Sequence, residues 1–269
     1  MSERPRDCAV EMHRIVREGA VLAGGARAIL LQIANPGVGE GVSRHSDFAY
    51  RPLDRLRTTL TYIFCVTYGT EREVEVITKL VTQAHAKVRG PGYNALDPEL
   101  QLWVAATLYD TATLLYERIF GPLDDETAER IYQEYALLGT ALQVPPSLWP
   151  ADRKAFRKYW DEMVATAEVT DHARAVAHDL LHNKSAPPWL RAALPFVRFI
   201  TTGMLPPSLR CEYGLSWDER KQRRYDLLMD GVALVYPRLP MVLRELPKTY
   251  YLRKMRKWLA SGRPAIAAE

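Results

Sequence analysis

The stretch from Gly24 to Tyr93 decides the fold of this chain, and it reads GGARAILLQIANPGVGEGVSRHSDFAYRPLDRLRTTLTYIFCVTYGTEREVEVITKLVTQAHAKVRGPGY. It holds three apolar segments with helical spacing, at about residues 26–34, 52–68 and 71–89. Each segment carries a polar residue on or beside its apolar stripe. These residues are Gln32 in the first segment, Arg55 and Thr59 in the second, and His85 in the third.

Helical spacing continues along the rest of the chain, and runs that alternate apolar and polar residues are scarce. Caps, prolines and glycines predict further helices at about 6–22, 97–120, 124–138, 151–167, 171–183, 187–202, 206–213, 217–235 and 241–261. Residues 37–51, with three glycines, are expected to form a functional loop. The sequence therefore predicts an all-α fold, a single domain over residues 1–269 built as a bundle of about ten helices.

The composition is that of a globular protein that folds in a reducing compartment. The 269 residues are 48% hydrophobic and 25% charged, and the net charge of +4 is too small to indicate nucleic acid as a partner. The three cysteines are far apart, which excludes a disulfide framework and a CxxC zinc site. The charged N-terminus and the absence of a long apolar run predict a soluble, cytoplasmic protein.

Arg55 and Thr59 are four residues apart and therefore neighbours on one helix face. A buried guanidinium needs an anionic or strongly dipolar partner, such as a propionate, a bound peroxide or a substrate carbonyl. An ion pair of Arg55 with Asp54 or Asp47 near the surface is the ordinary alternative. Spacing alone favours that alternative.

His85 lies four residues after Val81 and three before Val88, on the apolar stripe of its helix. A histidine that faces a core needs partners for both ring nitrogens. One nitrogen can bind iron while the other donates to a nearby acceptor. A core histidine bonded to two neighbours explains the position equally simply, and the residues alone favour it.

Two further patterns have a functional and a plain interpretation. His178 and His182 have the i,i+4 spacing of a metal site, but Asp179 stands where a zinc protease has its glutamate, so a solvated helix face is favoured. The basic, aromatic segment 241–261 can lie on an anionic membrane. It can also be a terminal helix that packs its aromatic rings and leaves its charges in water.

The motifs LLQIANP, HSDF, RPLDRLRTTLTYIFCVTYGT, VRGPGY, LDPELQLWVAATLYDT and TTGMLPPSLRCEYGLSW occur in this order. Their order and spacing resemble the MpaB/latex-clearing-protein oxygenase family, over roughly residues 10–220. The resemblance implies an all-α domain that encloses a haem-sized pocket with b-type haem.

By this resemblance His85 is the axial ligand of the haem iron, and Arg55 and Thr59 are the catalytic pair on the opposite face. His45 matches a family histidine, and Arg27 and Gln32 are weaker candidates for binding the cofactor. Thr58 stands where rubber-cleaving members can have a lysine, so polyisoprene is not assigned as the substrate.

The resulting hypothesis is a haem b-dependent oxygenase that uses dioxygen on a small hydrophobic, unsaturated substrate. One alternative is a non-catalytic haem or hydrophobic-ligand binding protein. Another is a helical protein that contacts a membrane surface through its basic C-terminal helix. The sequence predicts no nucleic-acid partner and leaves the oligomeric state open.

Overall fold

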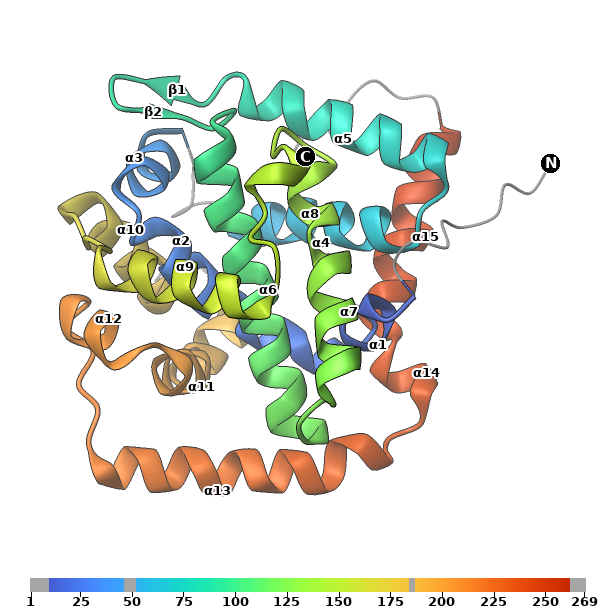
Figure 1. Cartoon of the computed structure of the whole chain (residues 1–269). Helices are drawn as coiled ribbons and strands as arrows, with labels where there is room; N and C mark the ends of the chain where they lie inside the picture. The colour runs from blue at the N-terminus through green and yellow to red at the C-terminus, as the bar shows by residue number, and fades with distance from the viewer. Residues whose placement is uncertain (1–9, 46–51, 184–186, 262–269) are drawn as a thin grey trace.

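The computed structural model of the chain describes residues 10–45, 52–183 and 187–261, except for the side chains of residues 52–55, 189 and 190. The described part is a bundle of helices, so the predicted all-α fold is confirmed (Figure 1). In chain order the elements are α1 (Met12–Val16), the 3-10 helix η2 (Gly19–Gly24), α2 (Gly25–Ile33), α3 (Pro36–His45), α4 (Pro52–Tyr68), α5 (Glu71–His85), β1 (Arg89–Gly90), β2 (Tyr93–Asn94), α6 (Pro98–Phe120), α7 (Asp125–Tyr135), α8 (Leu137–Thr140), η3 (Pro146–Leu148), α9 (Arg153–Ala165), α10 (Asp171–His182), α11 (Pro188–Met204), α12 (Pro207–Glu212), α13 (Glu219–Val235), η4 (Tyr236–Arg238), α14 (Met241–Arg244) and α15 (Leu246–Ala260).

Helix α6 is the central element, around which the other helices pack (Figure 1). Asp97 caps it by accepting a hydrogen bond from the backbone N–H of Glu99 at 2.9 Å, and Pro98 occupies the first turn. Gly121, with φ at +91°, ends it. Residues on nearly every side of α6 are buried, including Trp103, whose indole N–H donates to the carbonyl of Leu31 at 3.0 Å. This contact fixes α6 against α2.

Helices α4 and α5 have the predicted start points. Thr70 and Glu73 form a capping box at the start of α5, in which each side chain bonds the backbone N–H of the other residue. Cys65 in α4 is fully buried. Helix α5 packs against α4, and α15 covers another side of α4, where Tyr251 stacks on Phe64 with ring centroids 5.9 Å apart.

The predicted loop over residues 37–51 is wrong for its described part, because Pro36–His45 form helix α3. The Asn35 side chain accepts hydrogen bonds from the backbone N–H groups of Gly37 and Val38, at 3.0 and 3.3 Å, so the Asn-Pro pair that ends α2 also starts α3. A Cβ atom at Gly39 would lie 2.6 Å from the carbonyl oxygen of Ile33. The glycines therefore permit close packing rather than a mobile loop.

Two other predicted boundaries are wrong. The helix expected over 6–22 is described only from residue 10 onward, where it is split into α1 and η2. A Cβ atom at Gly19 would lie 2.9 Å from the carbonyl oxygen of Arg244, which shows how closely the C-terminal segment approaches this break. The helix expected to reach Arg89 ends at His85, because Arg89–Gly90 pair with Tyr93–Asn94 in a two-stranded antiparallel sheet.

The segment predicted as one helix over 241–261 consists of α14 and α15, with Glu245 between them. Leu252 and Met255 are buried, and Tyr251 and Trp258 are half-buried, so α15 packs its apolar and aromatic side chains as one of the two alternatives predicted. Of the helices that the structure describes, none by itself has the length and composition of a membrane span. The bent pair Gly19–Ile33 and Pro36–His45, which meet at 110°, passes that test only together.

Candidate functional site

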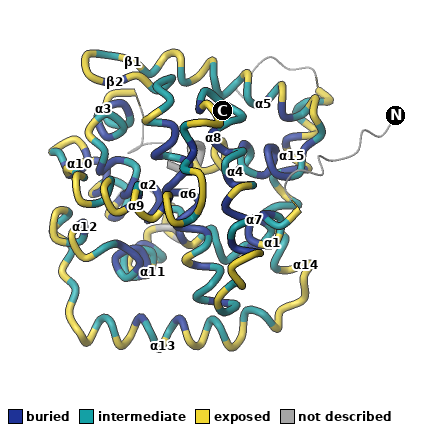
Figure 2. The backbone as a smooth tube through the Cα atoms, viewed as in Figure 1, coloured by how far each residue is buried: buried dark blue, intermediate teal, exposed yellow. Residues whose placement is uncertain are grey.

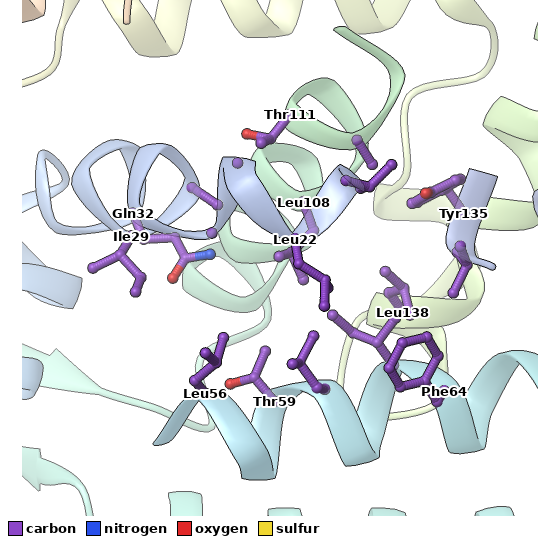
Figure 3. A pocket seen from close by; sticks show the side chains of 18 of the residues that line it. Leu22, Ile29, Gln32, Leu56, Thr59, Phe64, Leu108, Thr111, Tyr135 and Leu138 are labelled. Atoms are coloured by element: carbon purple, nitrogen blue, oxygen red, sulfur yellow. The ribbon is translucent and has the colours of Figure 1, made fainter. Parts of the chain in front are cut away.

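An apolar cavity of about 1020 Å³, counted with its open mouth, lies between α2, α4 and α6 (Figure 3). Its described lining residues are Val16, Val21, Leu22, Gly24, Gly25, Ala28, Ile29, Gln32, Ile33, Val42, Leu56, Thr59, Leu60, Ile63, Phe64, Leu108, Thr111, Ala112, Tyr135 and Leu138. Sixteen of these twenty are aliphatic, glycine or phenylalanine, so the cavity suits a large, mostly apolar ligand.

The mouth of the cavity lies beside the first half of α4. Leu56 and Thr59 are exposed to solvent and yet line the cavity, and Figure 3 shows both side chains directed toward it from α4. Leu60 and Phe64, one and two turns further along, are buried in its wall. The same face of α4 therefore runs from the entrance to the interior.

Four lining residues carry polar side chains, namely Gln32, Thr59, Thr111 and Tyr135. The amide of Gln32 donates to the hydroxyl of Thr107 on α6 at 3.0 Å, and that hydroxyl donates to the carbonyl of Val104 at 2.7 Å. Because its amide nitrogen is held in this way, the amide oxygen of Gln32 is the part best placed to meet a ligand.

Tyr135 is the polar group of the cavity that the sequence did not reveal. Its side chain is almost fully buried, and its hydroxyl has no hydrogen-bond partner among the described residues. Burial, with smaller effects from Tyr68 and Tyr109, raises the pKa of Tyr135, so the hydroxyl keeps its proton at neutral pH. Buried polar groups in native proteins rarely lack a partner. This hydroxyl is therefore a donor available to a ligand.

Arg27 lies behind the cavity rather than in its described wall. Its guanidinium is buried and forms three hydrogen bonds, to the carbonyl of Met204 at 2.8 Å, the hydroxyl of Thr111 at 2.6 Å and the carboxylate of Asp110 at 2.7 Å. The charge is thus neutralised by protein groups. Its link to a ligand, which remains a prediction, runs through Thr111, whose hydroxyl it holds in place.

His45 is exposed at the C-terminal end of α3, and its Nε2 lies 2.8 Å from the hydroxyl of Tyr93 on β2. This contact ties α3 to the small sheet that follows α5. His45 is not among the described residues that line the cavity. Its predicted part in binding a cofactor is not tested by this geometry.

His85 is the last residue of α5 and is half-buried. Three residues earlier on the helix, the hydroxyl of Thr82 accepts a hydrogen bond from the side chain of Gln143 at 3.1 Å. His85 is not among the described lining residues of the cavity, whereas α4, against which α5 packs, supplies one wall. The role of His85 as iron ligand stays a prediction.

The structure places Arg55 one turn before Thr59 in α4, as predicted, but its side chain lies outside the described residues. The His178 and His182 rings stack 5.0 Å apart on an exposed face of α10. No group of three or more metal-ligating side chains occurs in the part of the chain that the structure describes. Both histidine side chains lie on the solvent-exposed side of α10.

The apolar lining and the unpartnered hydroxyl of Tyr135 fit a mostly apolar ligand such as a haem or a hydrophobic substrate. A haem needs a protein side chain, often a histidine, to hold its iron and an apolar site for its ring. Two described histidines lie on helices that pack on α4. His13 on α1 bonds the carbonyl of Thr67 through Nε2 at 2.9 Å, and His85 ends α5. Fold and site together define an all-α protein with an apolar cavity between α2, α4 and α6.

The family described as "ER-bound oxygenase mpaB/B'/Rubber oxygenase, catalytic domain" matches residues 12–234. The chain therefore belongs to this oxygenase family, as its sequence motifs predicted. It is also similar to "Uncharacterized protein Rv2237" of Mycobacterium tuberculosis and "Uncharacterized protein Mb2261" of Mycobacterium bovis. Each is 40% identical over 256 residues, which cover 90% of this chain and 98% of the relative. No solved structure matches the chain significantly.

Proposed function

We propose that this protein is a haem b-dependent oxygenase that uses dioxygen on a hydrophobic, unsaturated substrate. The observation that carries the proposal is the apolar cavity behind Thr59, in a chain that belongs to an oxygenase family. Haem supplies the oxidative chemistry in such enzymes, while the protein positions the reactants and tunes the site. The contributions of this chain are binding, orientation and hydrogen bonding.

In the proposed site, His85 would hold the haem iron through one ring nitrogen. A histidine at the end of a helix keeps a defined orientation when its other ring nitrogen donates to a nearby acceptor. The second half of α5, with Thr82 bonded to Gln143, anchors the backbone on which this ring is carried. The apolar residues of α2 and α4 exclude water from the site.

Arg55 and Thr59 act on the substrate side of the proposed site. A guanidinium donates hydrogen bonds to an oxygen atom on which negative charge develops. Stabilisation of such charge by fixed donors is usually the largest single contribution to catalysis. The hydroxyl of Thr59, at the entrance of the cavity, orients oxygen or passes on a proton. The two residues lie one helical turn apart and can therefore serve the same oxygen atom.

Tyr135 and Gln32 give the proposed site its selectivity. Both lie in an otherwise apolar wall, so a substrate with one polar group on a long apolar body satisfies more of the site than a pure hydrocarbon does. The hydroxyl of Tyr135 donates to that polar group, and the amide oxygen of Gln32 accepts from it when it carries a proton.

The absorption spectrum of the purified protein, expressed with an adequate haem supply, tests the cofactor. We expect a Soret band in the wild type that is lost or shifted in His85→Ala and unchanged in the matched variant His45→Ala. A wild type without a Soret band would remove the haem from the proposal. Arg55→Ala is expected to keep the haem and to abolish turnover.

A second candidate function uses the same cavity without catalysis. The unpartnered hydroxyl of Tyr135 and the apolar wall of the cavity equally suit a protein that carries haem or another hydrophobic ligand. Oxygen consumption by the haem-loaded protein with a panel of long-chain alkenes separates the two functions. Uptake that depends on the alkene supports the oxygenase, and haem binding without any uptake supports the carrier.

A further inference from the structure

The C-terminal part of the chain exposes an unusual concentration of apolar side chains. Nine large hydrophobic residues of the described chain are more than half exposed, and six of them lie within residues 234–250. These six, here called the apolar corner, are Leu234, Val235, Val242, Leu243, Leu246 and Tyr250, with exposed fractions between 51% and 74%. Patches of this kind on a soluble surface mark a site of interaction.

The apolar corner occupies the turn where α13 ends and the chain passes through η4 and α14 into α15 (Figure 1). Prolines at positions 237, 240 and 247 break the chain into these short segments. In Figure 2 this part of the tube, around the α14 label, is mostly coloured as exposed. Packing against the rest of the protein therefore does not account for the apolar side chains here.

Charges within residues 234–250 are few and mostly neutralised. Glu245, the acidic residue of this stretch, bonds Lys248 at 2.6 Å. Arg244 bonds the buried carboxylate of Glu18 at 3.1 Å, and its side chain is only 11% exposed. Arg238 is the exposed charge that remains in this fully described stretch. The corner therefore presents apolar side chains and positive charge without an exposed acid.

The elements that flank the corner are strongly basic. Residues 219–260 contain eleven Lys and Arg and four Asp and Glu, a net charge of +7, whereas the whole chain carries +4. The remaining residues therefore carry −3. The positive charge of the protein is thus concentrated on α13, α14 and α15, the elements that carry the apolar corner. Such a separation of charge favours an anionic surface as the partner.

One face of α13 combines both features. Arg220, Arg224, Leu227, Asp230 and Leu234 are exposed and follow one another at spacings of four, three, three and four residues, so they share a helix face. The one acid among them, Asp230, is paired with Arg118 at 2.6 Å. Figure 1 shows α13 running along the lower edge of the molecule, with α14 and α15 continuing from its far end. The arginine end and the apolar end of this face can therefore contact the same surface.

We propose that the apolar corner and the arginines of α13 bind the surface of an anionic lipid bilayer. The apolar side chains enter the boundary between headgroups and acyl chains, and the guanidinium groups bond lipid phosphates. This contact overlaps the one predicted for residues 241–261, which contain four of the six corner residues, and extends it to the end of α13. Tyr251 of α15 takes no part in it, because its ring stacks on Phe64 of α4. The site is a surface contact and contains no membrane span.

A second copy of the chain is the other candidate to cover the apolar corner, but repulsion between like charges disfavours it. Two apolar corners brought together would also bring their basic flanks together, with no exposed acid from residues 234–250 to neutralise them. A bilayer that contains anionic lipid supplies many negative charges over an extended surface, which these scattered arginines can use.

Flotation of the full-length protein with lipid vesicles tests the proposal. We expect the wild type to float with phosphatidylcholine vesicles that contain about a third phosphatidylglycerol, and to bind at least about tenfold more weakly to phosphatidylcholine alone. The double variant Leu234→Glu/Val242→Glu is expected to lose at least about tenfold in binding, because two apolar anchors are replaced by like charges to the lipid. Phe196→Glu, a matched change at a residue 56% exposed on α11, is expected to bind as the wild type does.

Both variants change exposed residues, and circular dichroism melting verifies that they remain folded. Failure of the wild type to float with anionic vesicles, or equal flotation of the double variant, would overturn the proposal. Sedimentation velocity gives the other decisive result, since a dimer that the double variant loses, without vesicle binding, would assign the corner to a second copy. These assays need neither haem nor turnover, so they are independent of the proposed function.

Discussion

Two buried polar groups in or beside the cavity wall, Arg27 on α2 and Tyr135 at the end of α7, differ in their hydrogen-bond partners. The guanidinium of Arg27 donates hydrogen bonds to Met204, Thr111 and Asp110. The hydroxyl of Tyr135 has no partner among the described residues, although its side chain is equally buried. The protein itself supplies the hydrogen-bond partners of Arg27, whereas the hydroxyl of Tyr135 is left with a hydrogen bond to donate.

The difference distinguishes a buried polar group that stabilises the fold from one that can bind a ligand. Both kinds of group lie in or beside the wall of the same cavity. Leaving a buried donor unpaired costs free energy of folding, so a partner-free hydroxyl is retained only where a ligand or water supplies the missing bond. A buried ion pair, by contrast, depends on both partners being present. Four substitutions test this comparison, and they follow from the largest expected effect to the smallest.

Arg27→Met is expected to lower the free energy of unfolding by about 3 kcal/mol or more, because it leaves the carboxylate of Asp110 without its counter-charge in a largely buried site. Urea denaturation measures the loss. The double variant Arg27→Met/Asp110→Leu is the control, and it is expected to recover part of the stability because neither charge remains. A loss below about 1 kcal/mol in the single variant would show that Arg27 is not the structural group described here.

Gly24→Ala is expected to lower the free energy of unfolding by about 1–3 kcal/mol, because its Cβ atom would lie 2.4 Å from Cγ2 of Thr111 and 2.8 Å from Cδ1 of Leu115. The added methyl group would clash with Thr111, which lines the cavity and accepts a hydrogen bond from Arg27. Gly231→Ala on α13 is the matched control. No atom lies within 4 Å of its added Cβ, and it is expected to stabilise the helix by up to about 1 kcal/mol. Equal effects of the two changes would contradict the close packing at Gly24.

Tyr135→Phe is expected to leave the free energy of unfolding unchanged or slightly raised, because the hydroxyl that it removes has no partner. Tyr62→Phe makes the same change where the hydroxyl donates to the carbonyl of Leu138 at 2.7 Å, and it is expected to cost about 1 kcal/mol. Thermal unfolding of both variants without ligand makes the comparison. A larger loss at Tyr135 than at Tyr62 would show that Tyr135 has a structural bond after all.

Glu73→Gln is expected to lower the free energy of unfolding by less than about 1 kcal/mol, a smaller loss than in Tyr62→Phe, since the Arg256 partner of Glu73 is half exposed. Partial burial acts to raise the pKa of Glu73, but hydrogen bonds from Arg256 and from the Thr70 backbone outweigh it, and the pKa is lowered. A carboxylate with a lowered pKa stabilises the fold above its unfolded pKa and loses that contribution as the pH falls. The difference in stability between wild type and variant should therefore shrink below about pH 4. A difference that grew on acidification would have the wrong sign.

The sequence predicted the helices that carry local end signals. Asp97 and Pro98 mark the start of α6, and Thr70 with Glu73 marks the start of α5. Both helices therefore begin where the sequence predicted. Helix α3 was missed, because its glycines have a packing role that only the tertiary contacts reveal. A glycine whose added Cβ atom would lie 2.6 Å from a neighbouring carbonyl oxygen and a glycine in a loop have the same letter in the sequence.

The candidate site was predicted in part. Gln32 and Thr59 line the cavity, as their places on apolar stripes suggested, whereas Tyr135 was not recognised. Tyr135 follows a polar, charged stretch at the end of α7, and nothing in its spacing indicates that its hydroxyl lacks a partner. Hydrogen-bond satisfaction depends on side chains that are distant in sequence, and a single sequence does not contain it.

The assignment of the iron ligand is tested most directly by chemical rescue of His85→Gly, followed by absorption spectroscopy. Removing the ring leaves space in which added imidazole can bind the iron in its place. We predict that haem-loaded His85→Gly has a changed Soret band, that imidazole restores the wild-type spectrum, and that His45→Gly needs no rescue. A spectrum of His85→Gly identical to that of the wild type before imidazole is added would contradict the proposed ligation.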